Sequence, residues 1–321
     1  MSDTYRVRNW PDYNKALVQR GSICLILDKA VLSGWHSVSD TPKARGRKHL
    51  YSDLAIESVL MLGQLFKLPL RATSGFAASV FKLLGITDIQ VPDYTTLCRR
   101  RQSLNNYYFQ KSAKVPVAYV LIDSTGLRLY TASQWKRSRF RYSQDKARWR
   151  KLHVAMDGQS LNILDIQITP SNTSDCLVFP TLLKCLPQKV THVIADGAYD
   201  NTRCYRAAKQ KDVIPIIPPT TRARLQSENR NLVKDATLAM RDHNVRLMRV
   251  HGKGTQARSM WKKSSGYHKR SRVENAMFRL KRLFSDCLSA KGLHAQTVEM
   301  SMRCNWINYW NSLAMPQSYK I

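Results

Sequence analysis

Two apolar runs in the middle of the chain each end in an aspartate. The segment VLIDST places Asp123 after Val120, Leu121 and Ile122, and HVIADG places Asp196 after a similar run. Ligands of open α/β sheets bind at the carboxyl ends of the strands, so an acid mounted there is well placed for chemistry. Either aspartate alone is more simply a turn cap. As a pair joined by a third acid, they predict a site for hard divalent cations.

The third acid is Glu274, in the stretch YHKRSRVENAMFRLK, which holds five lysines and arginines and no other acid. At 100° per residue, four polar residues of this stretch fall within about 60° of one another: Tyr267, Arg270, Glu274 and Lys281. An apolar stripe lies beside them, formed by Val273, Met277, Leu280 and Phe284. One interpretation is a solvated face with an Arg270–Glu274 ion pair. The other is an acid that binds a cation, flanked by cations that hold phosphates.

The balance of charge indicates a polyanionic partner. The 321 residues include 52 Lys and Arg against 22 Asp and Glu, a formal net charge of +30. An excess of this size is typical of proteins that bind nucleic acid. The sequence has no dominant basic amphipathic helix and no apolar run of about 18 residues. We therefore expect nucleic acid as the partner and no membrane.

Residues 1–113 read as a helical region. Helices are predicted over DLAIESVLMLGQLFKL, which Ser52 can cap, and over ATSGFAASVFKLLG, which Gly85 closes. A further helix follows Asp93 and carries Arg99, Arg100 and Arg101. Helices joined by a short turn near 70–106 fit a helix-turn-helix that contacts DNA through these arginines. A plain helical bundle with a basic surface fits the pattern equally well.

From about residue 114 the pattern becomes that of an α/β sheet. VPVAYVLIDSTG reads as a strand that turns at Ser124–Gly126 into a hairpin with LRLYTAS. Strands are also predicted over WRKLHVAMDG, LNILDIQITP, KVTHVIADGAYD and DVIPIIP, with helices over SDCLVFPTLLKCL and NTRCYRAAKQK. This order predicts a sheet that starts antiparallel and continues parallel. Residues 219–265 are polar and basic without a core pattern, and helix returns at Gly266.

A second basic segment, WKRSRFRYSQDKARWRK, spans residues 135–151. It holds eight basic residues and one acid, with aromatic residues between them. Such a mixture can follow a phosphate backbone and stack on an unpaired base. A solvated basic hairpin is the simpler alternative. The candidate DNA contacts in it are Trp135, Lys136, Arg137, Arg139, Trp149 and Arg150.

Several blocks of the sequence resemble a known family. Tyr267-x2-Arg270-x3-Glu274-x6-Lys281 matches without a gap the Y-R-E-K signature of bacterial insertion-sequence transposases of the Asp-Asp-Glu class. RNWPDYNKALVQRGS, YSDLAIE, KLPLRATSGF and VPDYTTLCRRR are similar to the N-terminal region of the insertion-sequence-five family. IDSTGL, WRKLHVAMD and IADGAYDN are similar to the blocks around that family's first two acids. Motifs in the right order over almost the whole chain are far more specific than any one of them.

The resemblance implies a ribonuclease-H-like fold over 114–321, a mixed sheet flanked by helices, with 219–265 as a linker or small insertion. A helical DNA-binding region precedes it. The implied catalytic residues and metal ligands are Asp123, Asp196 and Glu274, and the implied DNA contacts are Tyr267, Arg270 and Lys281. Two magnesium ions, or manganese in their place, would activate the attacking oxygen and stabilise the leaving one.

The activity that the resemblance implies is transposition. Water frees a 3′ hydroxyl at the inverted-repeat ends of the element, and this hydroxyl attacks target DNA. The implied partners are double-stranded DNA and a second copy of the chain, because two ends must be brought together. A catalytically decayed or domesticated DNA-binding copy is the main alternative, and a nuclease of the same fold is another. A covalent route through Tyr267 is disfavoured, since the signature makes this residue a phosphate contact.

Other residues have simpler interpretations. Asp157 and Asp200 read as turn acids, although Asp200 is near enough to Asp196 in sequence to serve as an auxiliary ligand. His153 and Trp261 read as core or surface residues. The seven cysteines show no C-x-x-C spacing, which predicts reduced thiols rather than a zinc ribbon or disulfides. With a first segment too polar for a secretory signal, we expect a cytoplasmic, nucleoid-associated protein.

Overall fold

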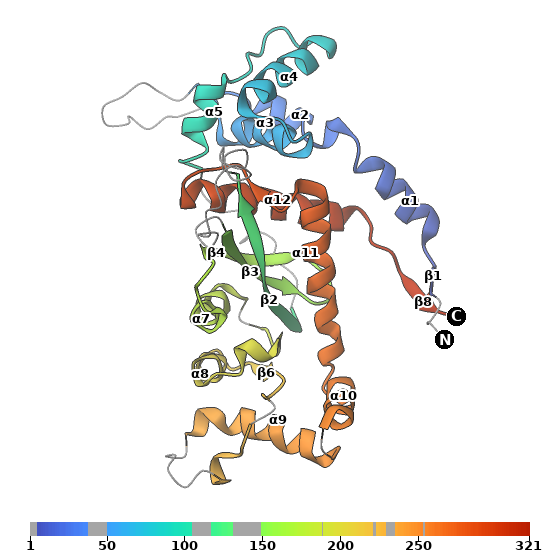
Figure 1. Cartoon of the computed structure of the whole chain (residues 1–321). Helices are drawn as coiled ribbons and strands as arrows, with labels where there is room; N and C mark the ends of the chain where they lie inside the picture. Colours follow the sequence, from blue (N-terminus) through green and yellow to red (C-terminus); the bar gives the residue numbers. More distant parts are fainter. Residues whose placement is uncertain are drawn as a thin grey trace, which may run out of the picture. The chain divides into compact units, whose positions relative to one another are not determined.

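The computed structural model describes residues 5–37, 50–104, 117–130, 149–187, 189–220, 223–228, 235–252 and 254–321. The chain divides into two compact units, Met1–Asn106 with Gly292–Ile321, and Tyr107–Lys291. The first is mainly helical and the second is built on a sheet (Figure 1). The predicted boundary at residues 113 and 114 lies outside the described ranges, and the predicted pair of domains stays a prediction. In the structure, residues 292–321 group with the first unit.

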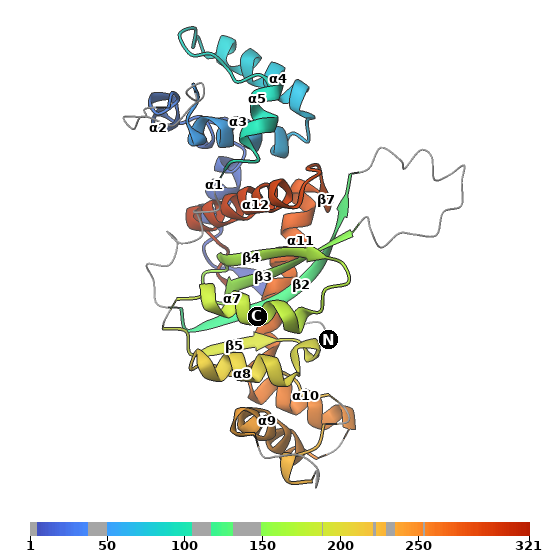
Figure 2. The same cartoon turned by 90° about the vertical axis from the view of Figure 1, so that its left-hand side faces the viewer.

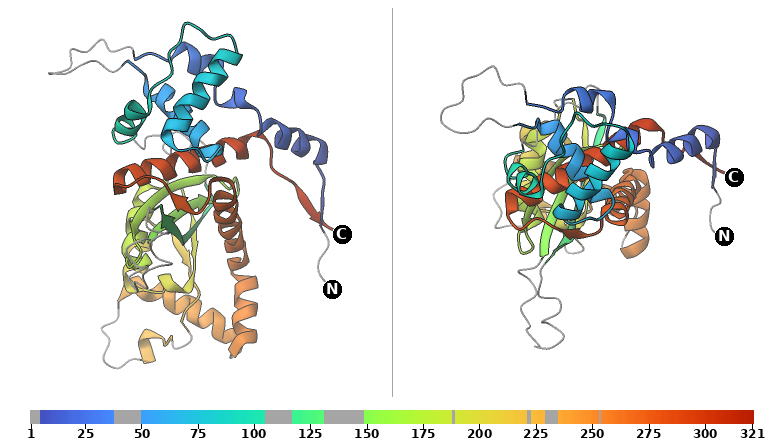
Figure 3. Two further views of the ribbon diagram at one scale, coloured as in Figure 1. Left: turned by 45° about the horizontal axis from the view of Figure 1, so that its top comes forward. Right: turned by 90° about the horizontal axis from the view of Figure 1, so that it is seen from above.

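Helices make up most of the first unit. They are α1 (Trp10–Gln19), α2 (Lys29–Ser33), α3 (Asp53–Leu65), α4 (Leu70–Leu83), α5 (Tyr94–Arg100) and α12 (Leu293–Leu313), with a 3-10 turn η1 at Ile23–Leu25. Strands β1 (Tyr5–Val7) and β8 (Ser318–Lys320) pair antiparallel. The two ends of the described chain therefore meet in one small sheet (Figure 3).

Helices α3, α4 and α5 lie where the sequence predicts them. The Ser52 hydroxyl accepts a hydrogen bond from the backbone N–H of Ala55 at 3.1 Å and so caps α3. Gly85 follows α4 with a φ of 70°, a backbone conformation that favours glycine. Asp93 caps α5 by accepting from the N–H of Thr95 at 2.7 Å. Whether these helices form a DNA-binding helix-turn-helix stays a prediction.

A buried ion pair joins α12 to the rest of the first unit. Arg303 pairs with Glu299 one turn earlier on the same helix, and their side chains are 4% and 0% exposed. The Nε of Arg303 also donates to Oε1 of Gln64 in α3 at 2.8 Å. Buried charges are tolerated only when partners replace their hydration. Both α3 and α12 must therefore be in place before this unit is complete.

The second unit contains a mixed sheet of six strands. Its strands are β2 (Tyr119–Leu129), β3 (Trp149–Asp157), β4 (Ile163–Pro170), β5 (His192–Ala195), β6 (Ile214–Ile216) and β7 (Cys287–Leu288). The order is β4-β3-β2-β5-β6, and β7 also pairs with β2. Strands β2, β3 and β4 run antiparallel, whereas β5 and β6 continue in parallel from β2. The predicted ribonuclease-H-like mixed sheet flanked by helices is confirmed.

Helices cover both faces of this sheet. Helices α7 (Asp175–Cys185) and α8 (Thr202–Gln210) lie on one face, and α11 (Ser271–Phe284) lies on the other (Figures 1 and 2). Alternate residues of β2 point to opposite faces. Val120 and Ile122 belong to the core cluster with the residues of α7 and α8. Asp123 therefore points to the face on which α11 packs.

The predicted hairpin at Ser124–Gly126 is wrong. Strand β2 continues through these residues to Leu129 and pairs with β3, with Gly126 opposite Lys151. Gly126 is not among the residues with positive φ, so it makes no tight turn. A Cβ atom here would lie 3.2 Å from Cε3 of Trp149, so the glycine makes room for that ring. Composition suggested a turn, whereas the glycine lies within an extended strand close to a neighbouring ring.

The segment predicted as a linker or small insertion contains helices of its own. Between residues 219 and 265 the structure has α9 (Ala239–Val250) and α10 (Gly254–Ser264), with 3-10 turns η5 (Gln226–Glu228) and η6 (Ala236–Leu238). Trp261 of α10 is 0% exposed. The segment therefore packs as a folded insertion, and Trp261 belongs to its core.

Two further expectations concern cysteines and membranes. All seven cysteines are free, as the absence of paired spacings predicts. Among the described residues, no helix combines the length and the apolar character needed to cross a membrane.

Loss of the Arg303 partner should destabilise the first unit. Glu299→Ala leaves a buried guanidinium without its carboxylate, and we expect a loss of about 3–5 kcal/mol in the free energy of unfolding. Urea unfolding followed by tryptophan fluorescence measures it. The matched control is Arg249→Gln, in an exposed pair with Glu228, which should leave the transition unmoved. Equal effects of the two changes would contradict the role of the buried pair.

Candidate active site

Asp123 lies on β2, at the centre of the sheet. Its side chain faces α11 and the residue is 8% exposed. The carboxylate Oδ1 accepts a hydrogen bond from the backbone N–H of Ser124 at 2.9 Å. Burial raises the pKa of Asp123, the Ser124 N–H and Arg270 lower it, and the negative charges of Asp196 and Glu274 raise it again. Both other acids are therefore near enough to act on this carboxyl group.

Asp196 follows β5, the parallel neighbour of β2. Ile122 pairs with Ala195, so Asp123 and Asp196 are the next residues of two adjacent parallel strands. Asp196 is the N-cap of a 3-10 turn, η4 (Gly197–Tyr199), and its Oδ1 accepts from the N–H of Ala198 at 2.9 Å. Strand register thus brings the two aspartates together at one edge of the core.

Glu274 lies in the first turn of α11, and its side chain is 53% exposed. Arg270 joins it to β2. Nη1 of Arg270 donates to Oδ2 of Asp123 at 2.8 Å, and Nη2 donates to Oε1 of the Glu274 carboxylate. The i, i+4 spacing offered the Arg270–Glu274 pair as one of two interpretations of this stripe. The contact with Asp123 shows in addition that the guanidinium bridges two of the candidate acids.

Tyr267 and Lys281 lie on either side of this bridge along the helical stripe. Tyr267 is in the 3-10 turn η7 (Tyr267–Arg270) and is 9% exposed, with the guanidinium of Arg270 5.8 Å from its ring centre. Burial raises the pKa of Tyr267, and the nearby charge of Arg270 lowers it. Nζ of Lys281 donates to Oγ1 of Thr125 at 2.6 Å. Thr125 follows Asp123 on the same face of β2, a partner that sequence reasoning missed.

The start of α11 has another anchor that the sequence did not reveal. Nη1 of Arg272 donates to the carbonyl oxygen of Gly158 at 2.7 Å and to the Tyr119 hydroxyl at 2.9 Å. Nζ of Lys269 lies 4.6 Å from the centre of the Tyr119 ring. A Cβ atom at residue 158 would lie 1.8 Å from that ring, so only glycine fits. The Asp157-Gly158 turn thereby holds the helix that carries Glu274.

The donor set suits a hard divalent cation, because carboxylate oxygens are the ligands such ions prefer. The site already holds a positive group, since the Arg270 guanidinium contacts Asp123 and Glu274. Over the described ranges, no three His, Cys, Asp or Glu residues are close enough together to hold a metal ion. The carboxylates suit a metal ion in their chemistry, and in this structure the guanidinium of Arg270 is the cation that contacts Asp123 and Glu274.

The other predicted DNA contacts differ in exposure. Arg99 is exposed, whereas Arg101 is buried. Arg100 is buried, donates from Nη1 to the carbonyl oxygen of Tyr51 at 2.7 Å and pairs with Asp53, so it ties α5 to the start of α3. In the second unit, Trp149 is 39% exposed and Arg150 is half-buried. Four predicted contacts lie outside the described residues: Trp135, Lys136, Arg137 and Arg139.

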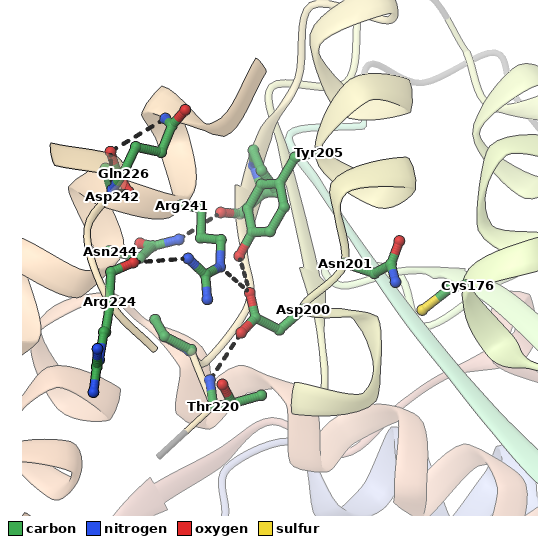
Figure 4. Close-up of polar contacts among 12 residues, drawn as sticks. Cys176, Asp200, Asn201, Tyr205, Thr220, Arg224, Gln226, Arg241, Asp242 and Asn244 are labelled. Carbon is green, nitrogen blue, oxygen red and sulfur yellow. Dashed lines mark hydrogen bonds and ion pairs between the residues drawn. The ribbon is translucent and has the colours of Figure 1, made fainter. Parts of the chain in front are cut away.

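Asp157 and Asp200 have different surroundings. Asp157 is a turn acid, because Oδ1 accepts from the N–H of Gln159 at 2.9 Å. The side chain of Asp200 is fully buried and pairs with Arg241 at 3.0 Å (Figure 4). Its carboxylate therefore has partners within the protein instead of lying beside Asp196 as an auxiliary ligand.

Two family models match this chain. A family model described as a transposase DDE domain matches residues 119–308, more than half of the chain. A second model with the same description matches residues 18–132. Among solved structures, the chain is similar to a piggyBac transposase in a synaptic complex with hairpin DNA. The two share 9% sequence identity over 93% of this chain and 75% of that one, with a TM-score of 0.40.

The raised pKa of Asp123 predicts how the stability of the metal-free protein depends on pH. Because its folded-state pKa lies above the ordinary 3.8, ionisation of this group as pH rises costs folding free energy. We expect Asp123→Asn to raise the melting temperature at pH 7, and this gain to vanish as pH falls toward 3.8. Thermal unfolding in chelator across this range measures it. The exposed Asp88→Asn is the control, and a gain independent of pH would contradict the assignment.

Proposed function

The chain belongs to the transposase DDE domain family, and on that premise we propose that it moves its own insertion sequence. In this proposal it binds the inverted-repeat ends of the element, hydrolyses a phosphodiester at each end and joins the freed 3′ hydroxyl to target DNA. The ungapped Tyr267-x2-Arg270-x3-Glu274-x6-Lys281 spacing supports membership of the insertion-sequence-five group. Such a chain would work in the cytoplasm, at the nucleoid.

One observation carries the proposal. Asp123 within β2 and Asp196 just after β5 follow a pair of residues that are in register on adjacent parallel strands, and Arg270 links Asp123 to Glu274 of α11. Residues that are 147 positions apart thus contact one another. We assign the catalytic role to these three carboxylates, which would also hold the metal. Divalent metal use follows from the family, and magnesium is the ion we propose. When bound, the cations would supply activation of the attacking oxygen and stabilisation of the leaving oxygen.

The two basic residues of the helical stripe, Arg270 and Lys281, have separate proposed roles. Arg270 pairs with carboxylates in this structure, and its planar guanidinium suits a two-pronged contact with a phosphate. We propose that it turns from the acids to the DNA backbone when the site is loaded. Lys281, held against β2 through Thr125, would add a point charge beside the same phosphate. Tyr267 packs against Arg270 and limits where the guanidinium can move.

Two DNA ends must be processed together, so we propose a homodimer in the complex with DNA. The formal charge of +30 favours contact with a long duplex, both at the ends and in the target. Arg99, exposed on α5, is the arginine of its cluster best placed to reach DNA. Trp149 and Arg150 are proposed contacts at the start of β3.

The proposal is tested on a plasmid that carries the coding sequence with its natural flanks. Asp123→Ala, Asp196→Ala and Glu274→Ala should each lower end cleavage and strand transfer with magnesium by about a thousandfold or more, because several kcal/mol of transition-state stabilisation are lost. Glu228→Ala, an exposed carboxylate in the same unit, is the control. Near-normal activity in any one variant would disprove the three-acid site. Cleavage without joined products would indicate a nuclease.

Arg270 and a divalent cation should compete for Asp123 and Glu274. Without divalent ions, Arg270→Gln leaves these carboxylates without their counter-charge, so we expect a lower melting temperature than that of the wild type. Magnesium should then raise the melting temperature of the variant more than that of the wild type, since no guanidinium has to leave. Arg282→Gln, exposed on the same helix, is the control. Equal magnesium shifts in all three proteins would rule out competition.

A further inference from the structure

Asp200 lies at the centre of a buried polar cluster (Figure 4). Its side chain is 0% exposed. Oδ1 accepts from the Tyr205 hydroxyl at 3.1 Å and from Nε of Arg241 at 3.0 Å. Oδ2 accepts from the backbone N–H of Thr220 at 2.8 Å. A buried carboxylate with donors on both oxygens is held in one position, because losing a partner leaves its charge uncompensated.

The donors come from elements that are far apart in sequence. Tyr205 is in α8, Thr220 follows β6, and Arg241 is in α9 of the insertion. Nη1 of Arg241 also donates to the carbonyl oxygen of Arg224 at 3.1 Å. From α10, Nη2 of Arg258 donates to the carbonyl oxygen of Pro219 at 2.7 Å. Two arginines of the insertion thus hold the chain that passes beside Asp200.

A single helical turn joins this cluster to Asp196. Turn η4 has Asp196 as its N-cap and Asp200 as its C-cap. The N–H of Asp200 donates to the carbonyl oxygen of Gly197 at 3.2 Å. Between them, Tyr199 is 1% exposed and its ring lies 5.4 Å from that of Phe179. The turn is short, it packs against Phe179, and its end is fixed at Asp200. A shift of Asp200 would therefore move Asp196.

We propose that Asp200 and Arg241 are positioning residues for the Asp196 carboxylate, and that through them the insertion sets the metal affinity of the site. The proposal rests on the assignment of Asp196 as a metal ligand. Neither residue touches the reacting atoms. If the cluster only stabilised the fold, its variants would lose metal binding and DNA binding to the same extent.

The experiment measures Mn²⁺ binding to the full chain without DNA, by the loss of the free-ion electron paramagnetic resonance signal. Asp200→Asn and Arg241→Gln should weaken Mn²⁺ binding about 10-fold or more, the usual size of such indirect effects. Arg241→Lys should recover part of the loss. Arg246→Gln, an exposed arginine on the same helix, should bind as the wild type does.

A second measurement separates positioning from a general loss of structure. Affinity for a duplex of random sequence in chelator should change less than about 2-fold in the same variants, because its phosphate contacts are spread over the surface. Should Asp200→Asn not fold, Tyr205→Phe removes one donor to Asp200 and serves instead. Unchanged Mn²⁺ affinity in the folded variants would overturn the proposal, as would an equal loss of DNA affinity.

Asp196→Asn separates failure of this proposal from failure of the proposed function. Should Asp196→Asn bind Mn²⁺ like the wild type, Asp196 is not a ligand and the three-acid site is wrong. Should Asp196→Asn lose Mn²⁺ while Asp200→Asn and Arg241→Gln keep it, the site stands and the positioning role is overturned.

Discussion

Carboxylates that share a small site repel one another, and the second unit must offset this repulsion in order to fold. It does so with cations and backbone donors placed beside the acids. Asp123 accepts from the Ser124 N–H and pairs with Arg270, Asp196 caps a turn, and Glu274 stays half in solvent beside the same arginine. Every one of these groups is a cation or a backbone donor. The site is therefore prepared for positive charge whether an arginine or a metal ion supplies it.

Much of the fold follows from local sequence patterns. Apolar runs and capping residues such as Ser52 and Asp93 predict their elements because the interactions involved span only a few residues. The hairpin expected at Ser124–Gly126 was wrong for a physical reason. These small residues resemble a turn, yet their backbone pairs with β3 and Gly126 gives room to Trp149. Composition does not distinguish a glycine in a turn from a glycine in a strand that lies close to a neighbouring side chain.

The candidate site was predictable in its members and less so in its contacts. Acids that follow apolar runs, together with family resemblance, indicated Asp123 and Asp196, and helical spacing indicated the Arg270–Glu274 pair. The contact from Arg270 to Asp123 depends on how α11 packs on β2, which no local pattern encodes. The fold of the insertion was also hard to predict, because its polar sequence shows no regular spacing of apolar residues. Its Arg241 contacts Asp200 across 41 positions, and only the folded chain brings them together.

The first unit is made from both ends of the chain, and this has a consequence for synthesis. Residues 292–321 complete it through α12, the pairing of β1 with β8 and the contact from Arg303 to Gln64. Domains fold as the ribosome delivers them, beginning with the earliest that is complete. The second unit, 107–291, is therefore the first to have all of its residues, although it begins later in the sequence. A chain released before its last helix would carry the acids but lack a finished helical unit.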